Sequence, residues 1–128
     1  MFSHVMIGSD DLVRSKLFYD AIFSSMGAKP GRKDDHGRLV YLHKGAVFMI
    51  GTPIDGGTAT HGNGSTIGFS LESPEQVHSW HDAAVVAGGT PIEDDPGVRH
   101  RAFGRLYLAY VRDPDGNKLC GLHRLPLE

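Results

Sequence analysis

The stretch His4-Val-Met-Ile-Gly-Ser-Asp10 is matched 62 residues further along the chain by Thr66-Ile-Gly-Phe-Ser-Leu-Glu72. Each stretch has the apolar pattern of a strand and leads into a segment with the spacing of an amphipathic helix. The two helices carry a large aromatic residue at the same offset, Phe18 in the first and Trp80 in the second, and a glycine follows each helix. A repeated supersecondary pattern predicts two similar modules, and such pseudo-twofold arrangements often hold a ligand site between the halves.

In the first half the pattern predicts a strand over 2–8, a helix over 12–26, a short edge strand over 29–33, and hairpin strands over 38–43 and 46–51. Asp10 or Asp11 can cap the helix, because a carboxylate accepts from the free N–H groups of the first turn. Phe18, Ile22 and Met26 form the expected buried stripe, and Gly27 supplies the left-handed stop.

The glycine-rich segment 52–64 has no periodicity and is expected to connect the halves. The second half predicts a strand over 65–71, a helix starting at Ser73-Pro74-Glu75-Gln76, and strands over 90–94, 105–112 and 117–123. The last two strands are joined by Asp113-Pro-Asp-Gly116, whose proline and glycine positions are typical of a type I turn. The predicted order is therefore βαβββ, twice.

Composition narrows the class of protein. The chain has 128 residues, a formal net charge of −2 and 40% hydrophobic residues, which fits one small α+β domain. The absence of long basic runs argues against nucleic-acid binding, and no apolar stretch reaches the ~20 residues that a membrane span needs. No secretory signal pattern opens the sequence, and the single cysteine, Cys120, suits a reducing compartment, so a cytoplasmic location is expected.

The doubled βαβββ order, with HVMIGSDD near the start and Asp113-Pro-Asp-Gly-Asn-Lys-Leu119 near the end, resembles the vicinal oxygen chelate superfamily of glyoxalases, bleomycin resistance proteins and extradiol dioxygenases. A segment beginning Pro96-Gly97 and rich in basic residues gives a closer likeness to small bacterial glyoxalase-like proteins. The resemblance implies one domain over 1–128, with module 1 at about 1–51, a linker at 52–64 and module 2 at about 65–124. It also implies an eight-stranded cup with helices outside and ligand inside, in a homodimer whose cups form within a chain or by module exchange.

The resemblance also points to four positions that would hold a divalent metal. His4 matches the family's first-strand histidine, whereas its counterpart in the second half is Thr66. Cys120 stands where the family usually has a carboxylate, and hairpin alignment maps it onto Met49. A hard divalent ion prefers oxygen and nitrogen donors. We therefore predict that the inherited metal site is lost and that no cofactor is bound.

One alternative keeps a metal. A soft pair of His4 and Cys120 could hold zinc or copper if His61 or His123 completed the ligand set.

Two classes of function remain open at this point. The first is a binding protein that takes a small organic molecule in a metal-free cup lined by His4, Met49, Thr66, Phe103, Tyr107 and Cys120. The second is a metal-dependent glyoxalase-like lyase, isomerase or dioxygenase with a rearranged site, or one that uses His4 as a general base. Arg99, His100, Arg101 and Arg105 could attract an anionic substrate or could form a solvated loop. The binding protein is the hypothesis we carry forward.

Overall fold

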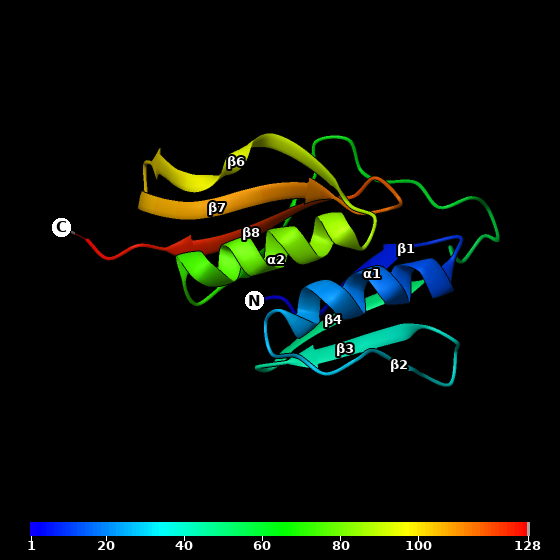
Figure 1. The fold of residues 1–128 in the computed structure, drawn as a ribbon. Helices are drawn as coiled ribbons and strands as arrows, with labels where there is room; N and C mark the ends of the chain where they lie inside the picture. The colour runs from blue at the N-terminus through cyan, green and yellow to red at the C-terminus, as the bar shows by residue number, and fades with distance from the viewer. Residues whose placement is uncertain (128) are drawn as a thin grey trace.

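The computed structural model describes residues 1–127 and contains two helices and eight strands in the order of Figure 1. The first module comprises β1 (Val5–Gly8), α1 (Leu12–Ser24), β2 (Arg32–Lys33), β3 (Leu39–His43) and β4 (Ala46–Gly51). The second comprises β5 (Ile67–Ser70), α2 (Pro74–Val86), β6 (Thr90–Arg101), β7 (Gly104–Arg112) and β8 (Lys118–Arg124). The predicted tandem βαβββ repeat is confirmed.

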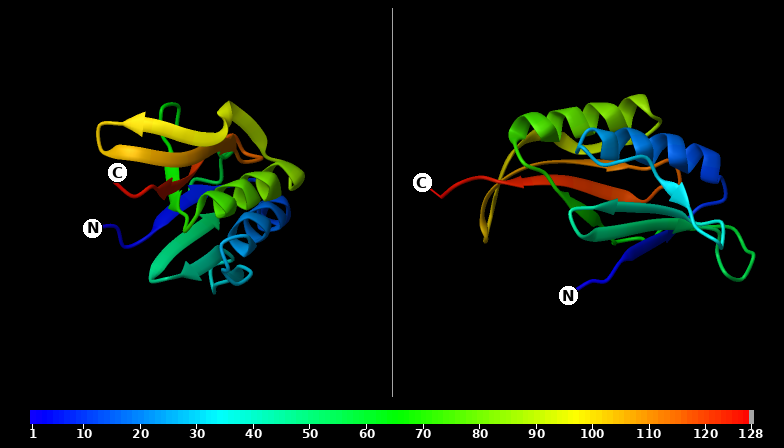
Figure 2. Two further views of the ribbon diagram at one scale, coloured as in Figure 1. Left: turned by 60° about the vertical axis from the view of Figure 1, so that its left-hand side comes forward. Right: turned by 90° about the horizontal axis from the view of Figure 1, so that it is seen from below.

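Each module forms its own four-stranded sheet. The strand orders are β1-β4-β3-β2 and β5-β8-β7-β6, so the two sheets have the same topology and each begins with a parallel pair. Within residues 1–127 no strand pairing joins one sheet to the other, and the eight strands do not close into a barrel. Figure 2 shows α1 and α2 side by side on one side of the strands. The other face of each sheet, which we call the helix-free face, is not covered by a helix.

One apolar core runs through both modules. From α1 it takes Phe18 and Ile22, as the helical spacing predicts, together with Tyr19 and Phe23, whereas Met26 of the predicted stripe is only partly buried. From α2 it takes Val77, Trp80 and Ala84. The ring of Phe69 in β5 packs edge-on against Phe23 and Phe48 of the first module, with centroids 5.2 and 5.7 Å away. Because aromatic rings of both modules share these contacts, the core is continuous across the boundary between them.

The predicted helix caps are present. The Asp11 carboxylate accepts from the Arg14 backbone N–H at 3.0 Å, and the Ser73 hydroxyl oxygen accepts from the Gln76 N–H at 3.0 Å. The Gln76 side chain does not return to the capping residue itself, since its Oε1 accepts from the Glu72 N–H at 2.8 Å. Both arrangements satisfy backbone donors that the first turn of a helix leaves free.

Several element boundaries differ from the prediction. Strands β1 and β5 begin at Val5 and Ile67, later than the predicted positions 2 and 65. Helix α1 ends at Ser24, two residues before Met26, and its chain reverses at Gly27 with a φ of +84°. Strand β6 continues to Arg101, although Asp94-Asp95-Pro96-Gly97 has the composition of a turn. A register shift between Ile92 and Gly97 absorbs these residues as a bulge, after which the pairing with β7 resumes.

No helix among residues 1–127 is long and apolar enough to cross a membrane.

Candidate functional site

Strand alternation decides which of the predicted site residues share a face. In the parallel pairs, Met49 lies beside Met6 and Cys120 lies beside Gly68. Their sequence neighbours Phe48 and Leu119 are buried in the core beneath the helices. Because successive side chains of a strand point to opposite faces, Met49 and Cys120 both lie on the helix-free face, one in each sheet. They occupy equivalent places in the two modules, as the hairpin alignment predicts.

His4 and Thr66 lie just before β1 and β5, and both are exposed. The Nδ1 atom of His4 is 2.7 Å from the Ser3 hydroxyl oxygen.

Cys120 is the most enclosed of the predicted site residues, with 5% of its surface exposed. It belongs to a small apolar cluster on the helix-free face with Leu106, Leu108, Tyr110 and Leu122. Burial raises the pKa of the Cys120 thiol to about 11, although a hydrogen bond with Tyr110 acts in the opposite direction. The thiol is therefore neutral at pH 7 and behaves as a small apolar side chain that lacks a nucleophile's thiolate.

Charged groups border this cluster. The Lys118 ammonium lies 4.6 Å from the centre of the Tyr110 ring and forms an ion pair with Glu93. Glu93 has a left-handed backbone, with φ of +59°, at the point where β6 bulges. The Arg99 guanidinium donates to the carbonyl oxygens of Asp94 and Asp95 at 3.1 and 3.0 Å, so it holds the bulge closed.

Sequence reasoning missed Glu93 and Lys118 as neighbours of Cys120. The adjacent Pro96-Gly97 resembles a turn, and nothing in the local pattern shows that the strand resumes beyond it.

Phe103 and Tyr107, the predicted aromatic lining, are not brought to Cys120. Phe103 is 81% exposed at the turn between β6 and β7. Tyr107 in β7 is the register partner of His123 in β8, and its side chain packs against the core on the helix side. There its hydroxyl oxygen lies 2.6 Å from Nε2 of His78 in α2.

The two histidines considered as further metal ligands have other partners. His123 lies on the helix side of β8, and its Nδ1 is 3.0 Å from the Leu71 carbonyl oxygen. His61 packs over Gly116 at the turn between β7 and β8.

The side chains at the four predicted ligand positions do not suit the divalent metal ion that the family resemblance implies. Among residues 1–127, no three His, Cys, Asp or Glu side chains are grouped so that they could hold an ion. The four inherited positions carry an imidazole, a thioether, a hydroxyl and a thiol whose raised pKa keeps it protonated. Hard divalent ions prefer carboxylate and imidazole ligands, so these residues are a poor match.

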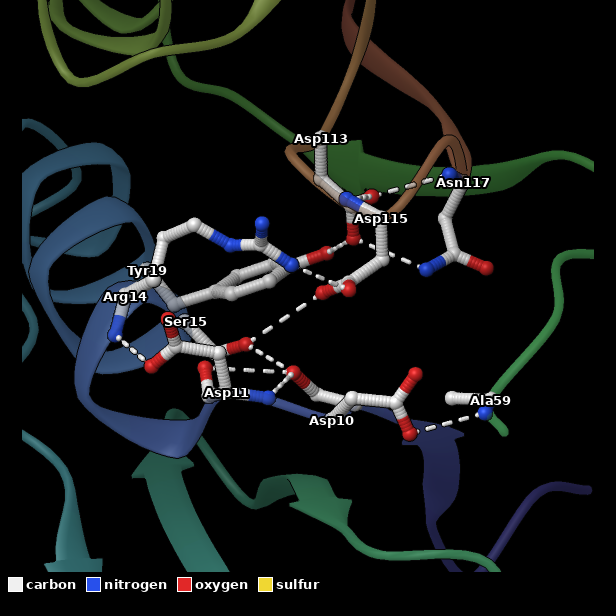
Figure 3. A network of polar contacts seen from close by, with 10 residues as sticks. Asp10, Asp11, Arg14, Ser15, Tyr19, Ala59, Asp113, Asp115 and Asn117 are labelled. Atoms are coloured by element: carbon white, nitrogen blue, oxygen red, sulfur yellow. Dashed lines mark hydrogen bonds and ion pairs between the residues drawn. The ribbon is translucent and has the colours of Figure 1, made fainter. Parts of the chain in front are cut away.

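The signature turn has a structural role that joins the two modules (Figure 3). Asp113 is buried and accepts a 2.5 Å hydrogen bond from the Tyr19 hydroxyl in α1. Asp115 forms an ion pair with Arg14 at 2.6 Å, and Ser15 donates to the same carboxylate at 3.4 Å. This turn of the second module is thus attached to the first helix of the chain. We call this set of contacts the inter-module clasp.

The tandem βαβββ architecture agrees with the comparisons of this chain with known proteins. The family model described as Glyoxalase/Bleomycin resistance protein/Dioxygenase superfamily matches residues 1–120. The chain belongs to that superfamily.

Solved structures support the same assignment. The chain is similar to a glyoxalase/bleomycin resistance protein from Albidiferax ferrireducens, with 54% identity over 97% of this chain and 99% of that one and a TM-score of 0.93. A glyoxalase/bleomycin resistance protein/dioxygenase family enzyme from Burkholderia phytofirmans is 20% identical over 96% and 98% of the two chains, with a TM-score of 0.74. A glyoxalase-related enzyme from Fulvimarina pelagi is 22% identical over 97% and 88%, with a TM-score of 0.72. The last two show the fold alone. None of the curated proteins compared with the chain matches it.

Proposed function

We propose that this protein is a cytoplasmic, homodimeric member of the superfamily that binds a small organic ligand on its helix-free face without the family's divalent metal. The observation that carries the proposal is the environment of Cys120. The position that resemblance assigns to a metal-binding carboxylate holds a buried, protonated thiol among Leu106, Leu108 and Leu122. Such a surface favours apolar contact with a ligand over coordination of an ion.

The polar groups beside Cys120 support recognition of an oriented ligand. Lys118, Glu93 and the Tyr110 ring border the apolar cluster, so a bound molecule can meet both apolar and charged groups. Ligand sites typically combine an apolar lining with a few polar groups that set orientation.

The proposed dimer is supported by apolar side chains that a single chain leaves in solvent. Met6 and Leu42, both on the helix-free face of the first module, are 42% and 67% exposed. A second copy could cover them and complete the cup, either beside the first or by exchange of modules. Light scattering is expected to report twice the 13.9 kDa mass of the single chain.

The test combines metal analysis with ligand screening. Protein purified without chelator or histidine tag is measured for Ni, Zn, Mn and Fe before and after incubation with each ion. We expect well under one equivalent per chain, and we expect small aromatic compounds to raise the melting temperature of the metal-free protein. Replacement of Cys120 by a bulkier residue, Cys120→Leu, is expected to remove that shift, whereas Cys120→Ser retains it.

A stoichiometric, tightly held metal would contradict this proposal. It would favour the alternative of a metal-dependent lyase, isomerase or dioxygenase with a rearranged site.

A further inference from the structure

A cavity of about 420 Å³ lies where the open edges of the two sheets face each other. Its lining comes from α1 and its following turn, β1, the β3–β4 hairpin, β5, and Glu72 two residues beyond β5. Phe23, Tyr41, Phe48 and Phe69 supply four aromatic rings on the helix side of this space. We call it the seam cavity. Its volume is within the ~300–1,000 Å³ range of small-molecule sites.

The seam cavity is separate from the apolar cluster around Cys120. Neither Cys120 nor its cluster neighbours Leu108 and Tyr110 are among the lining residues. Gly68 and Ser70 of β5 do line it, and both residues are exposed. A side chain at Gly68 would enter open space, since a Cβ built there meets no atom within 4 Å. That side chain would project on the helix-free face beside Cys120, opposite to the Phe69 ring, so Gly68 lines the cavity with its backbone.

The polar groups of the lining carry a particular charge pattern. Lys44 at the turn of the β3–β4 hairpin forms an ion pair with Glu72, which follows β5, so the pair bridges the two modules across the cavity. The two side chains are 60% and 62% exposed. His43 lies beside Lys44 in the lining. An exposed ion pair of this kind contributes little to stability, so a competing carboxylate can replace Glu72 at small cost.

The free edge of β5 adds hydrogen-bonding capacity. In the part of the chain that the structure describes, β5 pairs only with β8, on one side. The other edge of an outermost strand presents unpaired backbone N–H and C=O groups. A ligand lying in the seam can therefore meet backbone donors as well as aromatic rings.

We propose that the seam cavity is a second binding site, for a flat aromatic monocarboxylate. The aromatic body lies against Phe48 and Phe69, and the ligand carboxylate takes the place of the Glu72 carboxylate on Lys44. Apolar walls select the flat body, and the lysine selects the negative charge. This site does not depend on the ligand proposed for the helix-free face.

The test uses two probes of the same shape, 2-naphthoate and the neutral 2-naphthalenemethanol, measured by isothermal titration calorimetry. The wild-type protein is expected to bind the carboxylate at least tenfold more tightly than the alcohol. Lys44→Gln is expected to weaken 2-naphthoate about tenfold and to leave the alcohol unchanged. Glu72→Gln, which frees Lys44, is expected to strengthen 2-naphthoate. Lys29→Gln, at an exposed lysine outside the seam cavity, serves as the matched control.

A second pair of variants locates the site. Ala46, an exposed lining residue, lies two residues before Phe48 and so on the same face of β4. Ala46→Leu is expected to fill part of the cavity and to weaken both probes at least tenfold, with circular dichroism and a melting curve showing that the fold is kept. Cys120→Leu alters the helix-free face and is expected to leave the binding of both probes unchanged. The Lys44 and Glu72 variants test the same point at exposed positions if Ala46→Leu does not fold.

Three results would overturn the proposal: no binding of 2-naphthoate, equal affinity for the two probes, or loss of binding in Cys120→Leu with retention in Ala46→Leu. The last result would assign the probes to the helix-free face. Failure of the proposed function, in contrast, would show as bound metal or, among ligands whose binding the seam-cavity variant Ala46→Leu does not weaken, as melting-temperature shifts that Cys120→Leu does not affect.

Discussion

The carboxylate of Asp113 accepts four hydrogen bonds, from the Tyr19 hydroxyl, the Asn117 side-chain amide, and the backbone N–H groups of Asp115 and Asn117. A buried carboxylate is costly unless its oxygens are satisfied in this way. The residue therefore both shapes the turn and attaches it to α1. Its role here is structural, because its oxygens are occupied by the protein's own donors.

We predict that Asp113→Asn destabilises the protein by about 2–4 kcal/mol, because an amide group puts a donor where the carboxylate accepts. Tyr19→Phe is expected to cost less, about 1–2 kcal/mol, since it removes one hydrogen bond and keeps the ring. Urea denaturation followed by Trp80 fluorescence measures both. Asp35→Asn at an exposed position is the control, expected within about 0.5 kcal/mol of wild type. A loss below that size in Asp113→Asn would argue against the clasp.

Cys120 offers a direct chemical test of its burial. The rise of its thiol pKa from 9.0 to about 11 reduces the thiolate fraction about 100-fold at pH 8. We predict that iodoacetamide modifies the folded protein at least 100-fold more slowly than the urea-unfolded protein, and that the rate rises about tenfold per pH unit up to pH 10. Mass spectrometry of the alkylated protein gives the rates. Rapid modification at pH 7 would indicate an accessible, activated thiol and would favour the enzyme alternative.

The same raised pKa values predict how stability depends on alkaline pH. Burial and the Asp113 carboxylate raise the pKa of Tyr19 well above 10, and burial raises that of Cys120 to about 11. In the unfolded protein both groups lose their protons at a lower pH than in the folded protein. The contribution of the thiol to stability is therefore full below pH 9 and falls as pH rises through 9–11, and that of the phenol falls above pH 10. Each group contributes a slope of up to about 1.4 kcal/mol per pH unit. Tyr19→Phe is expected to flatten the decline above pH 10, and an unchanged decline would contradict the assignment.

At the scale of elements, both helices begin where their sequences predict. Asp11 and Ser73 cap α1 and α2, and Pro74 occupies the first turn of α2. These signals are local: a side-chain oxygen satisfies an N–H group three residues away, so no distant contact is needed to form the cap. The end of β6 lacks such a signal, because its bulge depends on pairing with β7.

We predict that Ser73→Ala destabilises the protein by about 1 kcal/mol through loss of the cap of α2. Ser24→Ala, at an exposed position near the end of α1, is the matched control and is expected to change stability by less than about 0.5 kcal/mol. Both values come from urea denaturation. Equal stability of the two variants would show that the Ser73 hydroxyl bond is not needed.

For the whole molecule, the shared aromatic core and the inter-module clasp predict one cooperative folding unit. Phe69 of the second module packs on Phe23 and Phe48 of the first, and the Tyr19–Asp113 hydrogen bond spans 94 residues of sequence. A module separated from its partner would expose these rings and leave the buried carboxylate without its phenol donor.

We therefore predict a single urea transition in which Trp80 fluorescence, a probe in the second module, coincides with far-UV circular dichroism, which averages both. A polypeptide of residues 1–64 alone is expected to be largely unfolded. Two separated transitions, or a folded 1–64 fragment, would show that the modules are independent.

The amino-acid sequence by itself determined the doubled βαβββ order, the helix caps and the Asp113–Gly116 turn, because periodicity, capping and turn chemistry act over a few residues. The superfamily was indicated by the resemblance of its motifs to a known family. The sequence also placed Met49 and Cys120 at equivalent positions. Only the tertiary structure decided that Tyr107 lies on the helix side beside His78, that Lys118 and Glu93 border Cys120, and that a cavity lies between residues of the two modules. These features depend on strand register and on contacts between distant residues, for which a sequence pattern carries no local signal.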